Sequence, residues 1–396
     1  MYLLNKNFQM EIVCQQSDLN IAIQLVNKAV SSRPTHPILS NILLTADEVT
    51  NKISLTGFDL NLGIQTSFDA GVDKSGAITI PSKILSEIVS KLPSESPVTL
   101  KVEEDTENIL LQSDRGSFNL KGIASDDYPK LPFVESGTSL DINPAGFLQA
   151  LKLTMFSSSN DESKQLLTGV NFKFKDQSLE SAATDGHRLA VVLTSEGENF
   201  SKLEMINNLN IGDDYLSVTI PTRSLREIEK LVSTKLKEDT IKLFYDKGQV
   251  VFISSNQIIT TRTLEGNYPN YGQLIPDNFS KVFKFERNLI INSLERIAVL
   301  ADQQSSVVKI NINDDNFASI SADAQDIGNA KELLPVSFNC DQIEIAFNVR
   351  YLLEGLRVIS SENILLKCNL PTTPAVLVPD DDSSFTYLVM PVQIRS

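Results

Sequence analysis

Residues 77–92 read AITIPSKILSEIVSKL, and residues 217–232 repeat the pattern as SVTIPTRSLREIEKLV. A third copy, EIAFNVRYLLEGLRVI, occupies residues 344–359. In all three copies a base, a leucine and a glutamate stand at the seventh, ninth and eleventh positions. The copies begin 140 and then 127 residues apart, a period that is too long for a solenoid unit and typical of a whole domain. The sequence therefore predicts one domain used three times in tandem.

Each copy of the domain is expected to hold two helices on one side of an antiparallel sheet, an α+β architecture. Apolar residues at a spacing of three or four predict the helices. Pro81 and Pro221 end strands, and Ser82 and Thr222 are expected as N-caps of the helices that follow. The predicted helices cover residues 19–33, 82–92, 146–158, 222–237, 287–300 and 349–360, and predicted strands include residues 38–44, 109–113, 169–174, 250–254, 307–312 and 364–368.

Polar, proline-containing stretches at residues 126–139 and 267–280 mark the junctions between the copies. The expected domains are residues 1–135, 136–275 and 276–396. An apolar content of 41% is enough for each domain to have a core of its own. Both junctions are short, so we expect the domains to sit close together.

Cysteine usage and hydropathy indicate the compartment. The three cysteines are isolated and form no C-x-x-C pair, which fits a reducing environment. The chain has no run of eighteen apolar residues, and residues 1–15 lack the charged-then-apolar pattern of a signal peptide. We therefore expect a cytoplasmic protein with no membrane partner.

The charge of the chain is unevenly distributed. A net charge of −15 would by itself argue against nucleic acid as a partner. The six predicted helices, however, carry 14 bases and 5 acids, so the remaining residues sum to −24. For a single helix, bases that only solvate an exposed face would explain this. Six basic helices in three copies favour a surface that binds phosphates without reading sequence, with strong salt dependence.

The helix predicted over residues 222–237 shows the pattern best. Arg223, Arg226, Lys230 and Lys237 fall within about 60° of arc on a helical wheel. The leucine, isoleucine and valine residues of the helix lie on the opposite side, where they can pack on a sheet. The helix is therefore expected to present its bases to a ligand.

Six short motifs occur along the chain. They are RPT at 33–35 with PIL at 37–39, LTGFDL at 55–60, ATDGHRLA at 183–190, NYPNY at 267–271, FN at 347–348 with YL at 351–352, and VMP at 389–391. In this order, and with the triplication, the sequence resembles the bacterial sliding clamp, the β subunit of DNA polymerase III. The resemblance implies a head-to-tail homodimer that closes as a ring, with twelve basic helices around double-stranded DNA and the sheets outside. It also implies a protein that is not an enzyme and needs no cofactor or metal.

The resemblance further implies a pocket between the second and third domains that takes short linear peptides. Leucine, proline, methionine and valine would supply an apolar slot, while the Asn348 amide and the Arg188 guanidinium could fix polar groups of the peptide. The implied lining residues are Leu167, Thr184, Gly186, His187, Arg188, Leu189, Pro269, Leu274, Asn348, Tyr351, Met390, Pro391 and Val392.

Five residues are expected to face DNA. Arg33 and Lys164 match basic positions of the clamp family beside the channel. Arg223, Arg226 and Lys230 are assigned by the charge pattern of their helix instead.

Two further regions are compared with the family. Val299 and Leu300 match hydrophobic residues at the protomer interface, although ordinary helix core is an equally good interpretation. The family commonly ends M-P-x-R-L, whereas here Gln393 replaces the base, and Arg395 and Ser396 extend the chain after Ile394. The effect of this tail on peptide preference, and the stability of the ring, are not determined by the sequence.

The leading hypothesis is a processivity factor that encircles DNA. It would tether the replicative polymerase, the clamp loader, repair polymerases, ligase and mismatch-repair proteins through linear motifs. An alternative is a triplicated scaffold that has lost DNA encirclement. A third reading, a hydrolase or metal site built on Asp185 and His187, has no nucleophile or further ligands that the sequence singles out.

Overall fold

The computed structural model describes residues 8–104, 106–114, 116–134, 137–175, 178–195, 216–234, 241–246, 248–254, 256–301, 306–313, 316–324 and 327–393. The chain forms two compact units. Among the described residues, the first unit comprises those within 8–142 and 241–263, and the second those within 143–195, 216–234 and 264–393.

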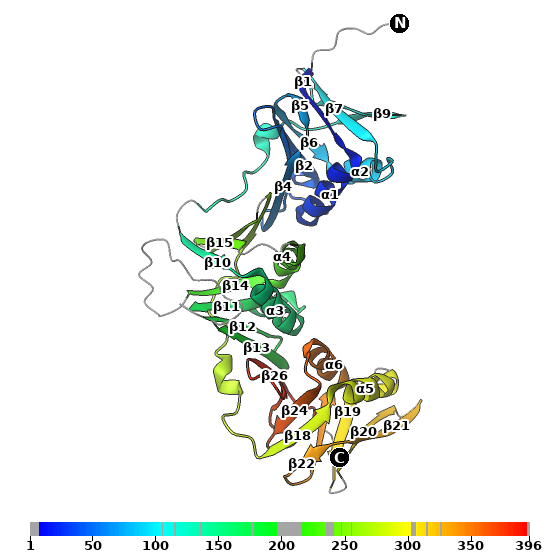
Figure 1. The fold of residues 1–396 in the computed structure, drawn as a ribbon, viewed down its shortest axis with the longest axis vertical. Coiled ribbons are helices and arrows are strands. Elements are labelled where there is room, and N and C mark those ends of the chain that lie inside the picture. Colours follow the sequence, from blue (N-terminus) through cyan, green and yellow to red (C-terminus); the bar gives the residue numbers. More distant parts are fainter. Residues whose placement is uncertain are drawn as a thin grey trace. The chain divides into compact units, whose positions relative to one another are not determined.

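The first unit is built from two antiparallel sheets and a pair of helices (Figure 1). Its elements are β1 (Phe8–Gln15), α1 (Gln16–Val26), β2 (Asn41–Asp47), β3 (Lys52–Phe58), β4 (Leu62–Asp69), β5 (Gly71–Lys74), β6 (Gly76–Pro81), α2 (Ser82–Val89), β7 (Pro97–Glu103), β8 (Asn108–Ser113), β9 (Gly116–Lys121), β10 (Thr138–Ile142), β15 (Ile241–Asp246), β16 (Gln249–Ser254) and β17 (Gln257–Arg262). One sheet has the strand order β5-β1-β7-β8-β9, and the other β10-β15-β16-β17-β4-β3-β2-β6.

The second unit combines a nine-stranded and a four-stranded sheet with two pairs of helices. Its elements are α3 (Pro144–Thr154), β11 (Gly169–Lys175), β12 (Ser178–Thr184), β13 (Arg188–Ser195), β14 (Leu216–Pro221), α4 (Thr222–Thr234), β18 (Lys281–Glu286), α5 (Arg287–Ala301), β19 (Val307–Ile312), β20 (Phe317–Ala324), β21 (Gly328–Pro335), β22 (Ser337–Phe338), β23 (Ile343–Asn348), α6 (Val349–Val358), β24 (Asn363–Cys368), β25 (Ala375–Pro379) and β26 (Phe385–Val389). The large sheet runs β14-β11-β12-β13-β26-β25-β24-β18-β22, and the small one β21-β20-β19-β23.

Both large sheets join strands from two successive copies of the repeat. In the first unit β17 pairs with β4, and in the second unit β13 pairs with β26 through partners such as Arg188 and Val389. This pairing satisfies edge strands that would otherwise be open. The second copy therefore contributes strands to both units. Each compact unit contains one large sheet that spans two copies. The domain boundaries at residues 135/136 and 275/276 stay predictions.

The six predicted helices are present, with some bounds different from those expected. The first helix was predicted over residues 19–33, but α1 ends at Val26 and a 3-10 turn over Asn27–Ala29 follows it, so Arg33 lies outside the helix. The strand predicted at residues 38–44 begins only at Asn41, because Pro37–Ser40 forms another 3-10 turn.

The N-cap predicted at Ser82 is also wrong. Pro81 is the N-cap residue of α2 and makes no capping bond, while the Ser82 hydroxyl donates to Oδ1 of Asn27 after α1. Thr222 likewise donates its hydroxyl to Ser158 Oγ, 2.9 Å away. Each hydroxyl therefore links the first residue of the second helix in a copy to the segment that follows the first helix.

Helix α4 packs as its apolar pattern predicts. Leu225, Ile228, Leu231 and Val232 are buried, and α4 lies against β14 and β11 of the large sheet. Helix α3 contacts β12 and β13 of the same sheet, α6 contacts β26, and α5 lies on the small sheet. The opposite side of α4 remains exposed for its bases.

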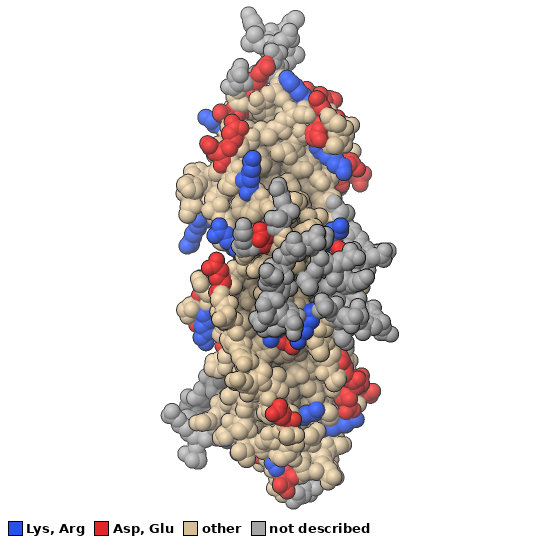
Figure 2. Space-filling model, turned by 90° about the vertical axis from the view of Figure 1, so that its left-hand side faces the viewer, with Lys and Arg blue, Asp and Glu red and all other residues tan. Residues whose placement is uncertain are grey.

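The charge excess of the helices is smaller than the sequence count. Within their structural bounds the six helices carry nine bases and six acids. Lys28, Arg33 and Lys91 lie beyond the ends of α1 and α2, and Lys237 lies outside the described residues. On the face shown in Figure 2, acidic and basic side chains are interspersed. The basic character is thus concentrated in particular helices and the turns after them.

Candidate peptide pocket and basic helical groove

The turn between β12 and β13 is built around Asp185. Its Oδ1 accepts the N–H groups of His187 (2.9 Å) and Arg188 (3.1 Å), which fixes the turn locally. Gly186 has a φ of +94°, a left-handed conformation that favours glycine. Thr184 completes the turn, because its hydroxyl donates to the Arg188 carbonyl at 2.6 Å and accepts from the Gly186 N–H. The imidazole of His187 is left exposed.

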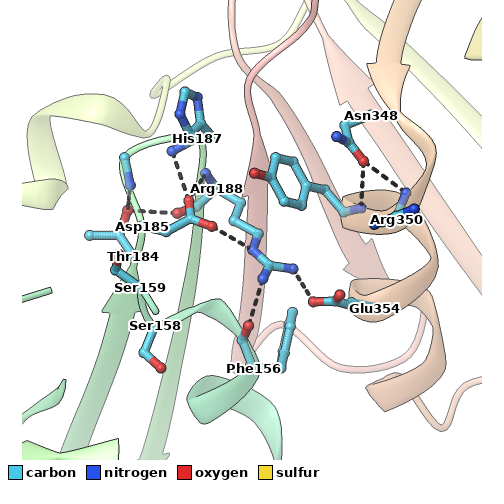
Figure 3. Close-up of polar contacts among 12 residues, drawn as sticks. Phe156, Ser158, Ser159, Thr184, Asp185, His187, Arg188, Asn348, Arg350 and Glu354 are labelled. Atoms are coloured by element: carbon cyan, nitrogen blue, oxygen red, sulfur yellow. Dashed lines mark hydrogen bonds and ion pairs between the residues drawn. The ribbon is translucent and has the colours of Figure 1, made fainter. Parts of the chain in front are cut away.

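Arg188 joins this turn to two other elements (Figure 3). Its Nε lies 3.0 Å from Asp185 Oδ2, its Nη1 pairs with Glu354 on α6, and its Nη2 donates to the Phe156 carbonyl at 2.8 Å. The guanidinium carbon lies 4.6 Å from the centroid of the Tyr351 ring. Burial by itself lowers the pKa of Arg188, but the nearby Tyr387 and Glu354 raise it above its ordinary value. The side chain is only 7% exposed, so Arg188 is a buried cation held by its partners.

The first turn of α6 faces the β12–β13 turn. Asn348 is the N-cap, and its Oδ1 accepts the N–H groups of Arg350 (2.9 Å) and Tyr351 (3.4 Å). The oxygen of the Asn348 amide, the group expected to fix polar groups of a peptide, is therefore engaged with the helix. The ring of Tyr351 stacks on His187, with centroids 6.3 Å apart and planes 18° from parallel. His187 and Tyr351 together form one wall.

The segment after β26 lies beside this wall. The Met390 N–H donates to the His187 carbonyl at 2.9 Å, and the Val392 N–H donates to the Ala346 carbonyl at 2.8 Å. Met390 is 38% exposed, while Pro391 and Val392 are half-buried. Gln393 is exposed, and Ile394, Arg395 and Ser396 lie outside the described residues.

Two tyrosines hold the segment that carries Pro269 and Leu274. Tyr268 Oη accepts the Thr184 N–H at 3.1 Å. Tyr271 is buried in a cluster that includes Leu189, and its hydroxyl donates to Glu180. Pro269 and Leu274 themselves are exposed, Leu274 by 52%.

Leu167 is half-buried in a 3-10 segment next to the same turn. The ammonium of Lys164, from that segment, lies 3.5 Å from the Asp185 carbonyl. The second compact unit thus collects the predicted pocket residues around three features. These are the β12–β13 turn, the start of α6 and the segment after β26.

A basic groove lies on the helical side of the second unit. Arg223, Arg226 and Lys230 are exposed on α4. Arg226 and Lys230 line a groove of about 650 Å³ together with Lys152 of α3 and Arg357 of α6. Its remaining lining is Leu151, Met155, Phe156, Glu229 and Val358.

Lys152 and Arg357 were not singled out by sequence reasoning, although both stand in helices that were counted as basic. The orientation of α3 and α6 toward α4 could not be predicted from the residue pattern of any one helix.

A second cavity, of about 370 Å³, is lined in part by Arg223 and Arg226 at the start of α4. Arg33 is exposed in the first unit.

Val299 and Leu300 lie in the last turn of α5. Val299 is 67% exposed, so its side chain is not ordinary helix core, and Leu300 is half-buried.

Among the described residues, no three His, Cys, Asp or Glu side chains gather as a metal ion would require. In the same parts of the chain, no helix has the length and apolar character needed to cross a membrane.

The sequence matches three family models along its length. They describe the N-terminal (residues 10–132), central (141–270) and C-terminal (272–393) domains of the DNA polymerase III beta subunit. The beta sliding clamp of Synechococcus elongatus is 44% identical over 388 residues, covering 98% of this chain and all of the relative.

Solved structures agree with the family models. The sliding clamp of Bacillus subtilis superposes with a TM-score of 0.87 at 27% identity, covering 98% of this chain and all of that one. A sliding clamp of Bartonella birtlesii bound to griselimycin has a TM-score of 0.87 at 26% identity, covering 97% of this chain and all of that one.

Three tandem domains of this architecture, with antiparallel sheets and paired helices, define a DNA polymerase clamp. The chain belongs to the family of the DNA polymerase III beta subunit, the bacterial beta sliding clamp. Members of this family are scaffolds of DNA replication, and closure into a dimeric ring is typical of them.

Proposed function

We propose that two copies of this chain close around duplex DNA and tether DNA polymerases through the pocket of the second unit. The observation that carries the DNA part is the convergence of Lys152, Arg226, Lys230 and Arg357, from three helices, on one groove. Cations fixed on a rigid helical scaffold attract phosphates without reading bases. Lys164 and Arg223 would add to this surface, and Arg33 would face DNA from the first unit.

The ring requires an interface between copies, and α5 with the small sheet offers one. Val299 is exposed by 67% and Leu333, on β21, by 63%. Strand β21 is an edge of its sheet, so its outer backbone groups can pair with another strand. Replacing Val299 and Leu300 by Asp should convert the dimer to a monomer in sedimentation velocity. A dimer that survives both changes would place the interface elsewhere.

The pocket would take an extended peptide with apolar side chains. Exposed Met390, His187 and Leu274 offer apolar and aromatic surface next to polar backbone groups. Methionine adapts to varied ligands, which suits a pocket shared by several partners. The replicative polymerase, the clamp loader, repair polymerases, ligase and mismatch-repair proteins are the partners we propose.

Topological binding is tested by retention on DNA. The protein is loaded by a clamp loader on a nicked circular duplex, half of the sample is cut once with a restriction enzyme, and bound protein is measured by gel filtration. A ring stays on the circle and leaves the free ends of the linear duplex. Equal retention on both forms would show ordinary electrostatic binding and would return the scaffold alternative.

Two variants separate the DNA surface from the pocket. Changing Arg223, Arg226 and Lys230 to Glu should weaken retention on the circle and leave griselimycin binding intact. Deleting residues 390–396 should abolish griselimycin binding and leave retention intact. If both variants lose both activities, the two surfaces are not separate.

A further inference from the structure

The guanidinium of Arg188 is placed where three elements of the second unit meet. Asp185 comes from the β12–β13 turn, Phe156 from the 3-10 turn after α3, and Glu354 from α6. These partners are 3, 32 and 166 residues away in the sequence. One side chain therefore holds together three segments that lie far apart in the sequence.

Each nitrogen of the guanidinium already donates to one of these partners. Two aromatic rings also lie close to the group, with the Tyr351 ring centroid 4.6 Å and the Phe156 centroid 5.6 Å from the guanidinium carbon. With 7% exposure, little of Arg188 is available to an incoming peptide. A role in touching the ligand, as the sequence suggested, is therefore disfavoured.

The residues beside Arg188 are those that do reach the surface. His187 is the preceding residue and is exposed, and its ring stacks on Tyr351, which in turn packs on the guanidinium. Glu354 lies one turn after Tyr351 on α6, so its pairing with Arg188 sets the position of that helix. The His187 carbonyl also anchors Met390.

We propose that Arg188, together with Asp185 and Glu354, is a positioning group that holds the His187–Tyr351 stack as the wall of the peptide pocket. Planar guanidinium geometry is needed, because three acceptors in different directions cannot be served by the single ammonium of lysine without moving. The proposal rests on the proposed use of this pocket for peptides, but the position of the stack can be measured without any ligand.

The small number of histidines allows the position of the His187–Tyr351 stack to be measured directly. The chain has two histidines, His187 in the second unit and His36 in the first. In protein with ¹³C-labelled histidine, the C2–H signal of His187 carries the ring current of Tyr351, and the signal of His36 serves as an internal reference. We expect Arg188→Lys to move the His187 signal toward that of a histidine with no ring stacked on it, and to leave the His36 signal in place.

Binding to the pocket is measured with griselimycin, the ligand of the Bartonella birtlesii clamp, which we propose occupies this pocket. Arg188→Lys should weaken its binding roughly tenfold, equivalent to about 1.4 kcal/mol. Glu354→Gln keeps the shape of the side chain and should shift the His187 signal in the same direction. Because the two residues act as one unit, the double variant should lose less affinity than the product of the single losses. Arg296→Lys, which changes an exposed arginine bonded to Glu332, is the matched control and should move neither readout.

The outcomes are distinct. A loss of affinity with an unmoved His187 signal would mean that Arg188 contacts the ligand itself, and would overturn the positioning role. An unmoved signal and unchanged affinity would overturn it as well. If the wild-type protein does not bind griselimycin but its His187 signal still moves in Arg188→Lys, the positioning role stands and the peptide-pocket proposal fails for this probe.

Discussion

Gly355→Ala sets two effects of opposite sign against each other. In an ordinary helix interior, alanine is more favourable than glycine by about 1 kcal/mol. A Cβ at residue 355 of α6, however, would lie 2.1 Å from Cε1 and 2.3 Å from Cδ1 of Tyr387. Tyr387 is fully buried, packs 5.3 Å from the Phe156 ring and donates its hydroxyl to the Tyr351 carbonyl at 2.8 Å. Its burial and these two contacts hold the ring against α6.

Overpacking of this kind costs about 3 kcal/mol at the upper end of its usual range. Subtracting the gain in helix propensity leaves a net loss of about 2 kcal/mol for Gly355→Ala. For a unit of this size that corresponds to a fall in Tm of roughly 4–8 °C. Differential scanning calorimetry measures it, since it separates the transitions of different units.

Gly272→Ala is the matched control for this prediction. A Cβ there meets only Asn270 Oδ1, at 3.6 Å, which is ordinary contact. Its Tm should be unchanged or slightly higher, because alanine restricts the unfolded chain. A Gly355→Ala protein as stable as the wild type, or more stable, would refute the close packing of α6 on Tyr387.

Three further predictions concern single features. Asn348→Ala removes the N-cap of α6 and should cost about 1 kcal/mol, or roughly 2–4 °C in Tm, by calorimetry. Burial raises the pKa of Glu180, but hydrogen bonds from Tyr271 and a lysine outweigh it and lower the pKa below its ordinary value. The stability of the wild type relative to Glu180→Gln should therefore be largest above pH 4.5 and decline as the pH falls further, as acid-titrated thermal melts would show. Changing Lys152 and Arg357 to Glu should reduce the slope of log affinity for DNA against log salt by about 2, and an unchanged slope would remove the groove from the DNA surface.

The repeat and the periodicity of its helices were readable from the sequence because both are local patterns. Helix α4 buries the apolar side that its spacing predicted, and the strands end at Pro81 and Pro221 as expected. Errors arose where local propensity competes with other bonds. Ser82 resembles an N-cap, but its hydroxyl bonds to Asn27, 55 residues earlier in the chain. The residues next to Ser82 in the sequence, from which a helix cap is predicted, do not include that partner.

The candidate pocket shows the same division. Resemblance to the clamp family named its residues, and the second unit brings most of them to three neighbouring features. Direct contact between Arg188 and a peptide stays a prediction, and the positioning role proposed for Arg188 could not be read from the sequence, because its burial depends on Phe156 and Glu354. The basic groove was likewise incomplete, since Lys152 and Arg357 meet α4 only when three helices pack together.

The sequence by itself determined that one α+β domain is used three times, and which faces of its helices are apolar. It could do so because side-chain spacing along a helix or strand repeats within a few residues. The tertiary structure decided that sheets continue from one copy into the next, and that Arg188 is a buried joint between two copies. Such pairings depend on which segments, distant in the sequence, form hydrogen bonds and ion pairs with each other. These partners come together only in the folded chain.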